Sequence, residues 1–494
     1  MFKALQGVHQ GMTLLYCIQA LSTFSYAVLY SSLSLYITKQ LGFSDLICNS
    51  IVGLFLGFNY ILHLLGGFIG GRYLSNRCLF LITTVIQTIG ISFLASANQA
   101  YFFIGLSLFL IGCGLNSTCY NNILTERFQG EDNQRDKAFF LSYAAMNIGF
   151  FAGYIISGFY DYSNQYQQLF YIAITTNVLT LIFIGFSWAQ IADKNTLLSA
   201  QKDPLQRYLK NSLGMVITLT LLPFLITCFN SSDFSNSLVV VISIIMLIII
   251  LILGQQQKIK ENKQKIHAYL ILTVSSILFW MIYYTGPMGV TLFIKNNVNR
   301  HLFGYELATQ WILNINAIVI IIGAPLMSSL LMKLRSAKFT VSVTNQFIWS
   351  FIILSFSFFA LAFSIKYANN QGYADINWII LHYITQALSE LLIGPIGYAM
   401  IGKIVPIKLQ GLLMGTWMMV SGVASSLSHY FSNLMVKTSS IDPLVTNSDY
   451  FSVFNQLGSW ALLGAVCLYF ISRKIKKFLD KPNKNVEFKA IALT

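Results

Sequence analysis

Fourteen long apolar segments constrain most strongly how this chain can fold. Each is about 18 to 25 residues long, which is enough to cross a bilayer as a helix. Strands are not expected, because the segments are too long and do not alternate apolar with polar residues. The chain is therefore predicted to be an all-α polytopic membrane protein. The predicted spans are 14–37, 50–70, 79–97, 101–124, 138–160, 169–191, 212–229, 235–254, 268–292, 308–331, 340–364, 377–402, 411–436 and 451–472.

The composition argues against a large soluble enzyme. Only 10% of the 494 residues are charged, whereas about a quarter of an ordinary soluble chain is charged. The sequence has no Walker loop, HExxH or GxSxG motif, so catalytic activity is not predicted. The seven cysteines are scattered without a CxxC pair, which predicts neither a disulfide framework nor a metal site.

The basic residues predict the orientation in the membrane. They lie in short loops between apolar segments, so the net charge of +14 does not indicate a nucleic-acid partner. If both termini lie on one side, 26 of the 31 Lys and Arg residues fall on that side. This asymmetry predicts two cytoplasmic termini and a location in the inner (plasma) membrane, with the lipid bilayer as a partner.

Two basic loops, at 193–211 and 255–267, isolate an apolar helix pair at 212–254. We therefore predict a six-plus-two-plus-six arrangement, which is typical of transporters. Its parts are an N-terminal six-helix bundle (1–192), linkers with an inserted helix hairpin (193–267), a C-terminal six-helix bundle (268–472) and a basic cytoplasmic tail (473–494).

Glu390 is the acidic residue predicted to lie near the middle of a span. A charge at that depth costs about 2.5 to 3.5 kcal/mol on insertion scales, so it usually serves transport or proton transfer. Glu390 shares a helix face with Tyr383, Gln386 and Gly394. It could bind a substrate ammonium group, carry a proton or alternate between the two, and the alternative is a structural hydrogen bond between helices.

Other polar and small residues within the spans allow more than one interpretation. His63 is a candidate for proton coupling, although a lone membrane histidine is more often a packing residue, and this holds more strongly for His382. The aromatic group at 280, 283 and 284 could line a cavity or anchor the helix at the interface. Gly149 and Gly153 form a GxxxG pair, which predicts close helix packing.

Two blocks resemble the proton-dependent oligopeptide transporter family of the major facilitator superfamily. The first is GLNSTCYNNILTERFQGEDNQRDKAFFLSYAAMNIG, and the second is LSELLIGPIGYAMIGKIVPIKLQGLLMGTW. The resemblance is to a divergent bacterial-type member, and it implies a major facilitator fold with two six-helix bundles and the inserted hairpin. The matching positions include Gly112, Gly114, Glu126, Asp132, Arg135, Asp136, Phe139, Tyr143, Asn147, Gly149, Glu390, Leu391, Pro395, Gly397, Pro406, Gly415 and Trp417.

The resemblance also implies a function and a set of site residues. The family imports di- and tripeptides with the proton gradient as the energy source, so no cofactor is expected, and we expect a monomer. Glu390 would receive the peptide amino terminus and, with His63, is a proton-coupling candidate. Asn316 fits the family's N-P…A-P segment, with Ala317 in place of the first proline. The implied substrate-binding residues are Glu390, Tyr26, Tyr60, Tyr143, Asn147, Asn316 and Trp417.

Several charges of the family pattern are missing from this chain. The acids and the arginine of the first-helix ExxER motif are replaced by Gln19, Ser22 and Thr23. Ser117 stands for the fourth-helix lysine, Tyr284 lies near the position of the seventh-helix acid, and Gly71 replaces the loop aspartate. Three hypotheses follow: a transporter of peptide-like or other amine-bearing solutes, a uniporter or exporter of an unrelated siderophore-like or drug-like molecule, and a transporter-like receptor.

Overall fold

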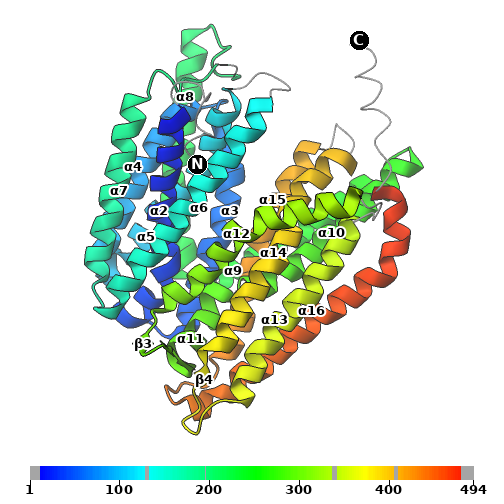
Figure 1. Ribbon diagram of the computed structural model, residues 1–494. Coiled ribbons are helices and arrows are strands. Elements are labelled where there is room, and N and C mark those ends of the chain that lie inside the picture. Colours follow the sequence, from blue (N-terminus) through cyan, green and yellow to red (C-terminus); the bar gives the residue numbers. More distant parts are fainter. Residues whose placement is uncertain (1–11, 128–132, 195, 337–341, 405–409, 480–494) are drawn as a thin grey trace. The chain divides into compact units, whose positions relative to one another are not determined.

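The computed structural model describes residues 12–127, 133–194, 196–336, 342–404 and 410–479 (Figure 1). Fourteen α-helices of at least 20 residues occur in this part of the chain. Twelve helices there are long and apolar enough to cross a membrane. The predicted all-α, multi-pass architecture is confirmed. Asp132, Pro406 and the predicted tail beyond residue 479 lie outside the described residues.

By their internal contacts, the residues divide into two compact units. Unit 1 comprises Met1–Ser235 with Ala308–Ala317, and unit 2 comprises Asn236–Leu307 with Ile318–Thr494. The helix pair predicted as an insertion is divided between them, since α8 belongs to unit 1 and most of α9 to unit 2. The bundle limits expected from the sequence, at residues 192 and 268, stay a prediction.

Unit 1 consists of long helices, most of them joined by short loops, with a longer linker between α7 and α8. Its described elements are α2 (Met12–Leu35), the π-helical turn η1 (Tyr36–Gln40), α3 (Asp45–Ile69), α4 (Asn76–Ala95), α5 (Gln99–Thr125), α6 (Asn133–Tyr162), α7 (Tyr166–Phe186) and α8 (Pro204–Asn230). Within this unit α4 packs against α5, and α2 packs against α6.

Unit 2 holds the remaining long helices and four two-residue strands. Strands β1 and β4 pair in parallel, and β2 pairs antiparallel with β3. The elements are α9 (Ser232–Gln255), α10 (Lys260–Tyr283), the π-helical turn η2 (Gly286–Val290), α11 (Thr291–Asn297), β1 (Val298–Asn299), β2 (His301–Leu302), β3 (Tyr305–Glu306), α12 (Thr309–Ser336), α13 (Val343–Lys366), β4 (Ala374–Asp375), α14 (Ile376–Ile404), α15 (Gln410–Met435) and α16 (Pro443–Leu479). The first residues of α12 belong to unit 1.

The span predicted at 268–292 is not one continuous helix. Helix α10 ends at Tyr283, a π-helical turn follows at Gly286–Val290, and α11 begins at Thr291. Met288 has non-helical dihedral angles in this turn (φ −114°, ψ −107°). The preceding Pro287 cannot donate a backbone hydrogen bond, which accounts for a break at this point.

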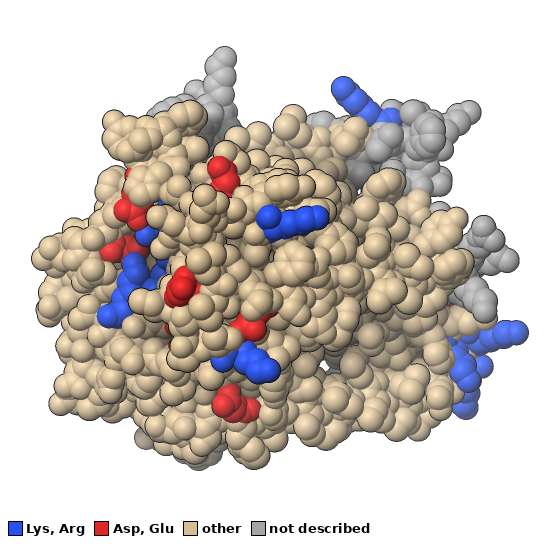
Figure 2. Space-filling model, turned by 90° about the horizontal axis from the view of Figure 1, so that it is seen from below, with Lys and Arg blue, Asp and Glu red and all other residues tan. Residues whose placement is uncertain are grey.

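Polar side chains at the ends of the spans cap the N-termini of several helices. Ser44, Ser75 and Ser342 each accept a hydrogen bond from a backbone N–H of the first helical turn, and Asp203 does the same for α8. These N-caps satisfy donors that a helix leaves unpaired at its start. The molecular face in Figure 2 carries only scattered charged residues among a large area of other side chains.

Glycines allow the helices of unit 1 to approach closely. A Cβ on Gly153 would lie 2.7 Å from the Cβ of Ala27 in α2, and one on Gly149 would meet the carbonyl oxygen of Ala20. The close packing predicted for this GxxxG pair is therefore confirmed. Gly90 of α4 makes a similar approach to the backbone of α5, where a Cβ would lie 2.8 Å from the oxygen of Gly105.

Candidate functional site

Glu390 lies halfway along α14 and contacts α10. The Tyr283 hydroxyl donates a hydrogen bond to Glu390 Oε2 at 2.6 Å. One turn earlier on α14, the buried Gln386 side chain donates to the Tyr283 carbonyl oxygen at 3.5 Å. We call Glu390, Tyr283 and Gln386 the Glu390 cluster. It combines a half-buried carboxylate with a phenol and an amide, a group that can bind a cation or hold a proton.

Aromatic rings surround the α10 side of the Glu390 cluster. Trp280 and Tyr283 have ring centroids 5.1 Å apart, and Tyr284 packs against both at 5.7 Å. Tyr283 is itself part of the Glu390 cluster, and the two interpretations offered for this aromatic group, a cavity lining and an interface anchor, stay predictions. Aromatic faces beside a carboxylate also favour cationic ligands, because their π-systems attract positive charge.

Trp417 also contacts α10, but at a position along the helix axis that differs from the one that Glu390 contacts. Its ring lies 6.3 Å from that of Tyr269, whose hydroxyl donates to the carbonyl oxygen of Leu413 at 2.8 Å. Tyr269 and Tyr283 are fourteen residues apart on α10, which corresponds to about 21 Å along a helix axis. The contacts of Trp417 and Glu390 on α10 are therefore well separated.

A second polar group lies in unit 1, between α2, α3 and α5. Asn59 donates to the Tyr26 hydroxyl at 3.4 Å and accepts from the Cys113 thiol at 3.5 Å. His63, one turn further along α3, bonds through Nδ1 to the carbonyl oxygen of Asn59, and its ring lies 5.8 Å from that of Tyr60. We call Tyr26, Asn59, Tyr60 and His63 the Tyr26 cluster. Three of these four residues were candidates from the sequence.

The remaining candidates in unit 1 lie on α6 and α12. Asn147 is buried and donates to the Tyr143 carbonyl oxygen at 2.8 Å, whereas the Tyr143 side chain is 47% exposed. Asn316 is half-buried on α12. Two other residues of that helix contact α6: Trp311 donates to the Ile155 oxygen at 2.9 Å and Asn314 to the Phe151 oxygen at 3.3 Å.

A neutral hydrogen-bonded network occupies part of the region where the family pattern has charges. Asn116 of α5 donates to the Ser22 hydroxyl at 3.4 Å and to the Thr84 hydroxyl at 3.5 Å. The Gln87 amide lies 3.5 Å from the Ser25 hydroxyl. These side chains are neutral and bond to one another without an ion pair, so the loss of both acids and the arginine leaves no unmatched charge among them.

Sequence reasoning missed Asn59 and did not connect Tyr283 to Glu390. Asn59 lies at four-residue spacing from His63, so the helical period places both on one side of α3. No signal within one sequence pairs Tyr283 with a residue 107 positions later. No group of three or more His, Cys, Asp or Glu side chains is placed to hold a metal ion in the part of the chain that the structure describes.

Comparison with known sequences yields one family and several full-length relatives. A sequence profile of the POT family matches residues 77–451. Dipeptide and tripeptide permease A of Salmonella typhimurium strain LT2 is 24% identical over 467 residues, covering 94% of this chain and 92% of the relative. The permease of the same name from Escherichia coli K12 is 22% identical over 94% of this chain and 92% of its own length.

Solved structures confirm the predicted fold. A crystal structure of a mutant peptide transporter POT in complex with alafosfalin has a TM-score of 0.85 at 20% identity, and 97% of each chain is covered. A POT family transporter in complex with 5-aminolevulinic acid has a TM-score of 0.81 at 21% identity, with 95% of this chain and 98% of the other covered.

Proposed function

The chain belongs to the POT family, and from this premise we propose that it is a secondary active transporter of small peptide-like solutes. The solutes are of the di- and tripeptide class, moved by alternating access and driven by the proton gradient. Transport, and not catalysis, is the activity proposed. The support comes from relatives named dipeptide and tripeptide permease that match along nearly the whole chain, and from the Glu390 cluster.

The observation that carries the proposal is the hydrogen-bonded carboxylate of Glu390 in the middle of α14. The amino terminus of a peptide is a cation at neutral pH, and a carboxylate in a medium of low dielectric constant attracts it strongly. The Tyr283 hydroxyl stabilises the charged carboxylate, because hydrogen bonds to an ionised group favour that form. The cluster thus offers a site for the ammonium end of a substrate.

The same carboxylate can couple transport to protons. Protonated Glu390 is neutral and does not attract an ammonium group, so proton and substrate compete for this carboxylate, and cotransport in one direction requires a second group that holds the proton while the substrate is bound. We propose that Glu390 alternates between proton and substrate. Substrate contacts by Tyr26, Tyr60, Tyr143, Asn147, Asn316 and Trp417, and a proton-coupling role of His63, remain part of this proposal.

One observation favours a second candidate, uniport or export of an unrelated small molecule. The neutral network of Ser22, Thr84 and Asn116 lies in the region where the family pattern has charged residues. A substrate carboxylate has amide and hydroxyl donors there in place of an Arg or Lys, and these bind it less strongly. The receptor hypothesis has no comparable observation in its favour.

The proposed location is the inner (plasma) membrane, with both termini in the cytoplasm. The excess of basic residues on one side of the predicted topology supports it. We propose that the chain acts as a monomer in the bilayer and needs no cofactor beyond the proton gradient.

The function is tested by uptake into proteoliposomes. We expect radiolabelled dialanine to accumulate when the outside is acidic, because each pH unit across the membrane supplies about 1.36 kcal/mol per proton. Liposomes without protein are the control, and unlabelled dialanine should compete. Uptake at the same rate with and without the proton gradient supports the uniporter hypothesis. If the folded protein gives no flux in either condition, the chain does not carry dipeptides.

Tyr283→Phe is expected to weaken transport without affecting the fold. The change removes the hydroxyl that bonds to Glu390 Oε2 and keeps the ring that packs against Trp280. A hydrogen bond to a charged group contributes about 1.5 to 3 kcal/mol, so dialanine uptake at low substrate concentration should fall about tenfold or more. Tyr171→Phe, on the exposed side of α7, is the control. Equal uptake by Tyr283→Phe and the wild type contradicts a role for this bond.

A further inference from the structure

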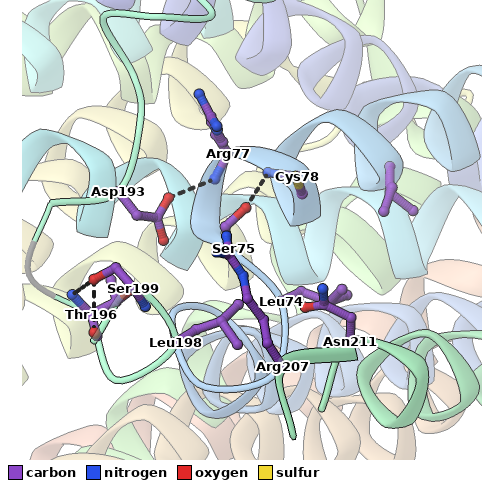
Figure 3. Close-up of a pocket in the computed structure, with 11 residues that line it drawn as sticks. Leu74, Ser75, Arg77, Cys78, Asp193, Thr196, Leu198, Ser199, Arg207 and Asn211 are labelled. Atoms are coloured by element: carbon purple, nitrogen blue, oxygen red, sulfur yellow. Dashed lines mark hydrogen bonds between the residues drawn. The ribbon is translucent and has the colours of Figure 1, made fainter. Parts of the chain in front are cut away.

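A pocket of about 320 Å³ lies in unit 1, and none of its lining residues belongs to the Tyr26 cluster. Three segments line it, as Figure 3 shows: the start of α4, the linker after α7, and the start of α8. We call it the linker pocket. Its lining residues are Leu74, Ser75, Arg77, Cys78, Ile82, Asp193, Thr196, Leu198, Ser199, Arg207 and Asn211.

Hydrogen bonds hold the linker in place beside this pocket. Asp193 accepts from the backbone N–H groups of Asn76 at 2.8 Å and Arg77 at 3.3 Å. Leu198 donates to the carbonyl oxygen of Gly71 at 2.9 Å. Directly before Asp193, the carbonyl oxygen of Ala192 accepts a hydrogen bond from the Arg127 guanidinium at 2.6 Å. The linker wall of the pocket is therefore bonded to the start of α4 and to the loop before it.

Neutral hydrogen-bond donors hold the Asp193 carboxylate in place, and its negative charge is outnumbered by the two arginines of the pocket lining. Its two carboxylate oxygens receive the two backbone donors and, in addition, the Asn76 side-chain amide at 3.2 Å. This carboxylate takes up the amide donors at the start of α4, so those donors are not offered to a ligand. The polar groups that a ligand can use are side chains.

The lining includes two guanidinium-bearing residues. Arg77 donates one hydrogen bond to the Trp188 carbonyl oxygen at 3.1 Å and lies 4.6 Å from the centre of that ring. A guanidinium has five donors, so Arg77 keeps donors for another partner. Among the described residues, Arg207 makes no ion pair with an acidic side chain. A planar guanidinium suits phosphate oxygens, which it can bind through two hydrogen bonds.

The pocket changes from polar to apolar along α4. Ser75, Arg77 and Cys78 lie at the first turn, Ile82 lies one turn further into the candidate span, and Leu74 and Leu198 add aliphatic surface. Beside Arg207 on α8, the side chains of Leu205, Tyr208 and Leu209 are exposed. Basic and apolar residues mixed at the start of a span are typical of the membrane interface. This gradient fits an anionic group attached to an apolar chain.

We propose that the linker pocket binds an anionic phosphate group, with Arg207 and Arg77 as its charged contacts and Ser75 as a hydroxyl donor. The group can belong to an anionic phospholipid or to free phosphate. The bound phosphate group contacts both α8 and α4, and it thereby stabilises the position of the linker against these two helices.

The test is native mass spectrometry of the full chain in detergent, titrated with phosphatidylglycerol. Arg207→Gln should weaken binding of the first lipid about tenfold, because it removes a charge-assisted bidentate contact. Lys202→Gln is the matched control: it removes one positive charge from the linker, five residues before Arg207, at a residue outside the pocket lining. Lys202→Gln should bind like the wild type.

Two further arms of the experiment use other probes. Phosphatidylcholine, which has no net charge, should bind more weakly than phosphatidylglycerol. Millimolar inorganic phosphate that displaces phosphatidylglycerol from the wild type identifies free phosphate as an occupant, and failure to displace it identifies the lipid headgroup. The proposal is overturned if Arg207→Gln binds phosphatidylglycerol like the wild type, if Lys202→Gln weakens binding equally, or if phosphatidylcholine binds as tightly.

Discussion

Replacing Glu390 with Gln is expected to abolish proton-driven uptake of dialanine while leaving the protein folded. Gln keeps the size of the side chain and can still accept a hydrogen bond from Tyr283, but it has no negative charge and no titratable proton. Removing one partner from a buried charge pair costs about 3 to 5 kcal/mol. Uptake at low substrate concentration should therefore fall by about a hundredfold or more.

The matched control is Glu306→Gln, the same chemical change in unit 2. Glu306 is 41% exposed and pairs with Arg300 at the β2–β3 hairpin, so its loss should have little effect on uptake. Size-exclusion chromatography and circular dichroism of both variants report on folding. Wild-type rates of gradient-driven uptake by Glu390→Gln would refute the role of the carboxylate in transport.

A second assay separates the two roles proposed for Glu390. Counterflow measures exchange of labelled for unlabelled dialanine without a proton gradient. If Glu390→Gln retains counterflow but loses gradient-driven uptake, the residue carries the proton and another group holds the substrate ammonium. If both activities disappear, the carboxylate contacts the substrate itself.

Replacing Gly90 with Val is expected to destabilise the protein strongly. A Cβ at this position would lie 2.8 Å from the oxygen of Gly105 and 2.9 Å from the carbonyl carbon of Leu108, both backbone atoms of α5. Backbone atoms cannot rotate away as a side chain can, so α4 and α5 would have to separate. Forcing extra atoms into a packed interface costs about 1 to 3 kcal/mol and occasionally more, and we expect the upper end of this range.

Gly185→Val provides the control for the Gly90 prediction. Gly185 lies near the end of α7, and a Cβ there would meet no described atom within 4 Å. Both variants place a β-branched residue in a helix, so their difference isolates the clash with α5. Thermal unfolding in detergent and the yield of monodisperse protein are the measurements. If the two variants have the same unfolding temperature, the close approach of α4 and α5 does not limit stability.

Sequence reasoning could locate Glu390 because its signal is local. An acidic residue within a long apolar run is visible without any knowledge of neighbouring helices, and its depth follows from the rise per residue. The same is true of the helix count and of the Gly149 and Gly153 pair. The interruption of the predicted 268–292 span depended on the backbone conformation around Met288, and residue hydropathy does not specify it.

The hydrogen-bond and packing partners of the site residues, in contrast, have no local signal in the sequence. Tyr283 was visible as one of several aromatic residues, and Asn59 as one of many polar residues in the spans. What distinguishes them is contact with Glu390 on α14 and with Tyr26 on α2. Trp417, which belongs to the same sequence block as Glu390, instead packs against Tyr269, about 21 Å further along α10.

A multi-pass helical membrane protein with a carboxylate inside a span could be predicted without the structure, because length, hydropathy and charge are properties of single segments. Which side chains meet across helices could be learned only from how the helices pack. In a soluble helix the polar face marks the outside, but lipid is as apolar as the protein interior. The apolar pattern of a membrane span therefore does not fix its rotation, and packing against neighbouring helices must supply it.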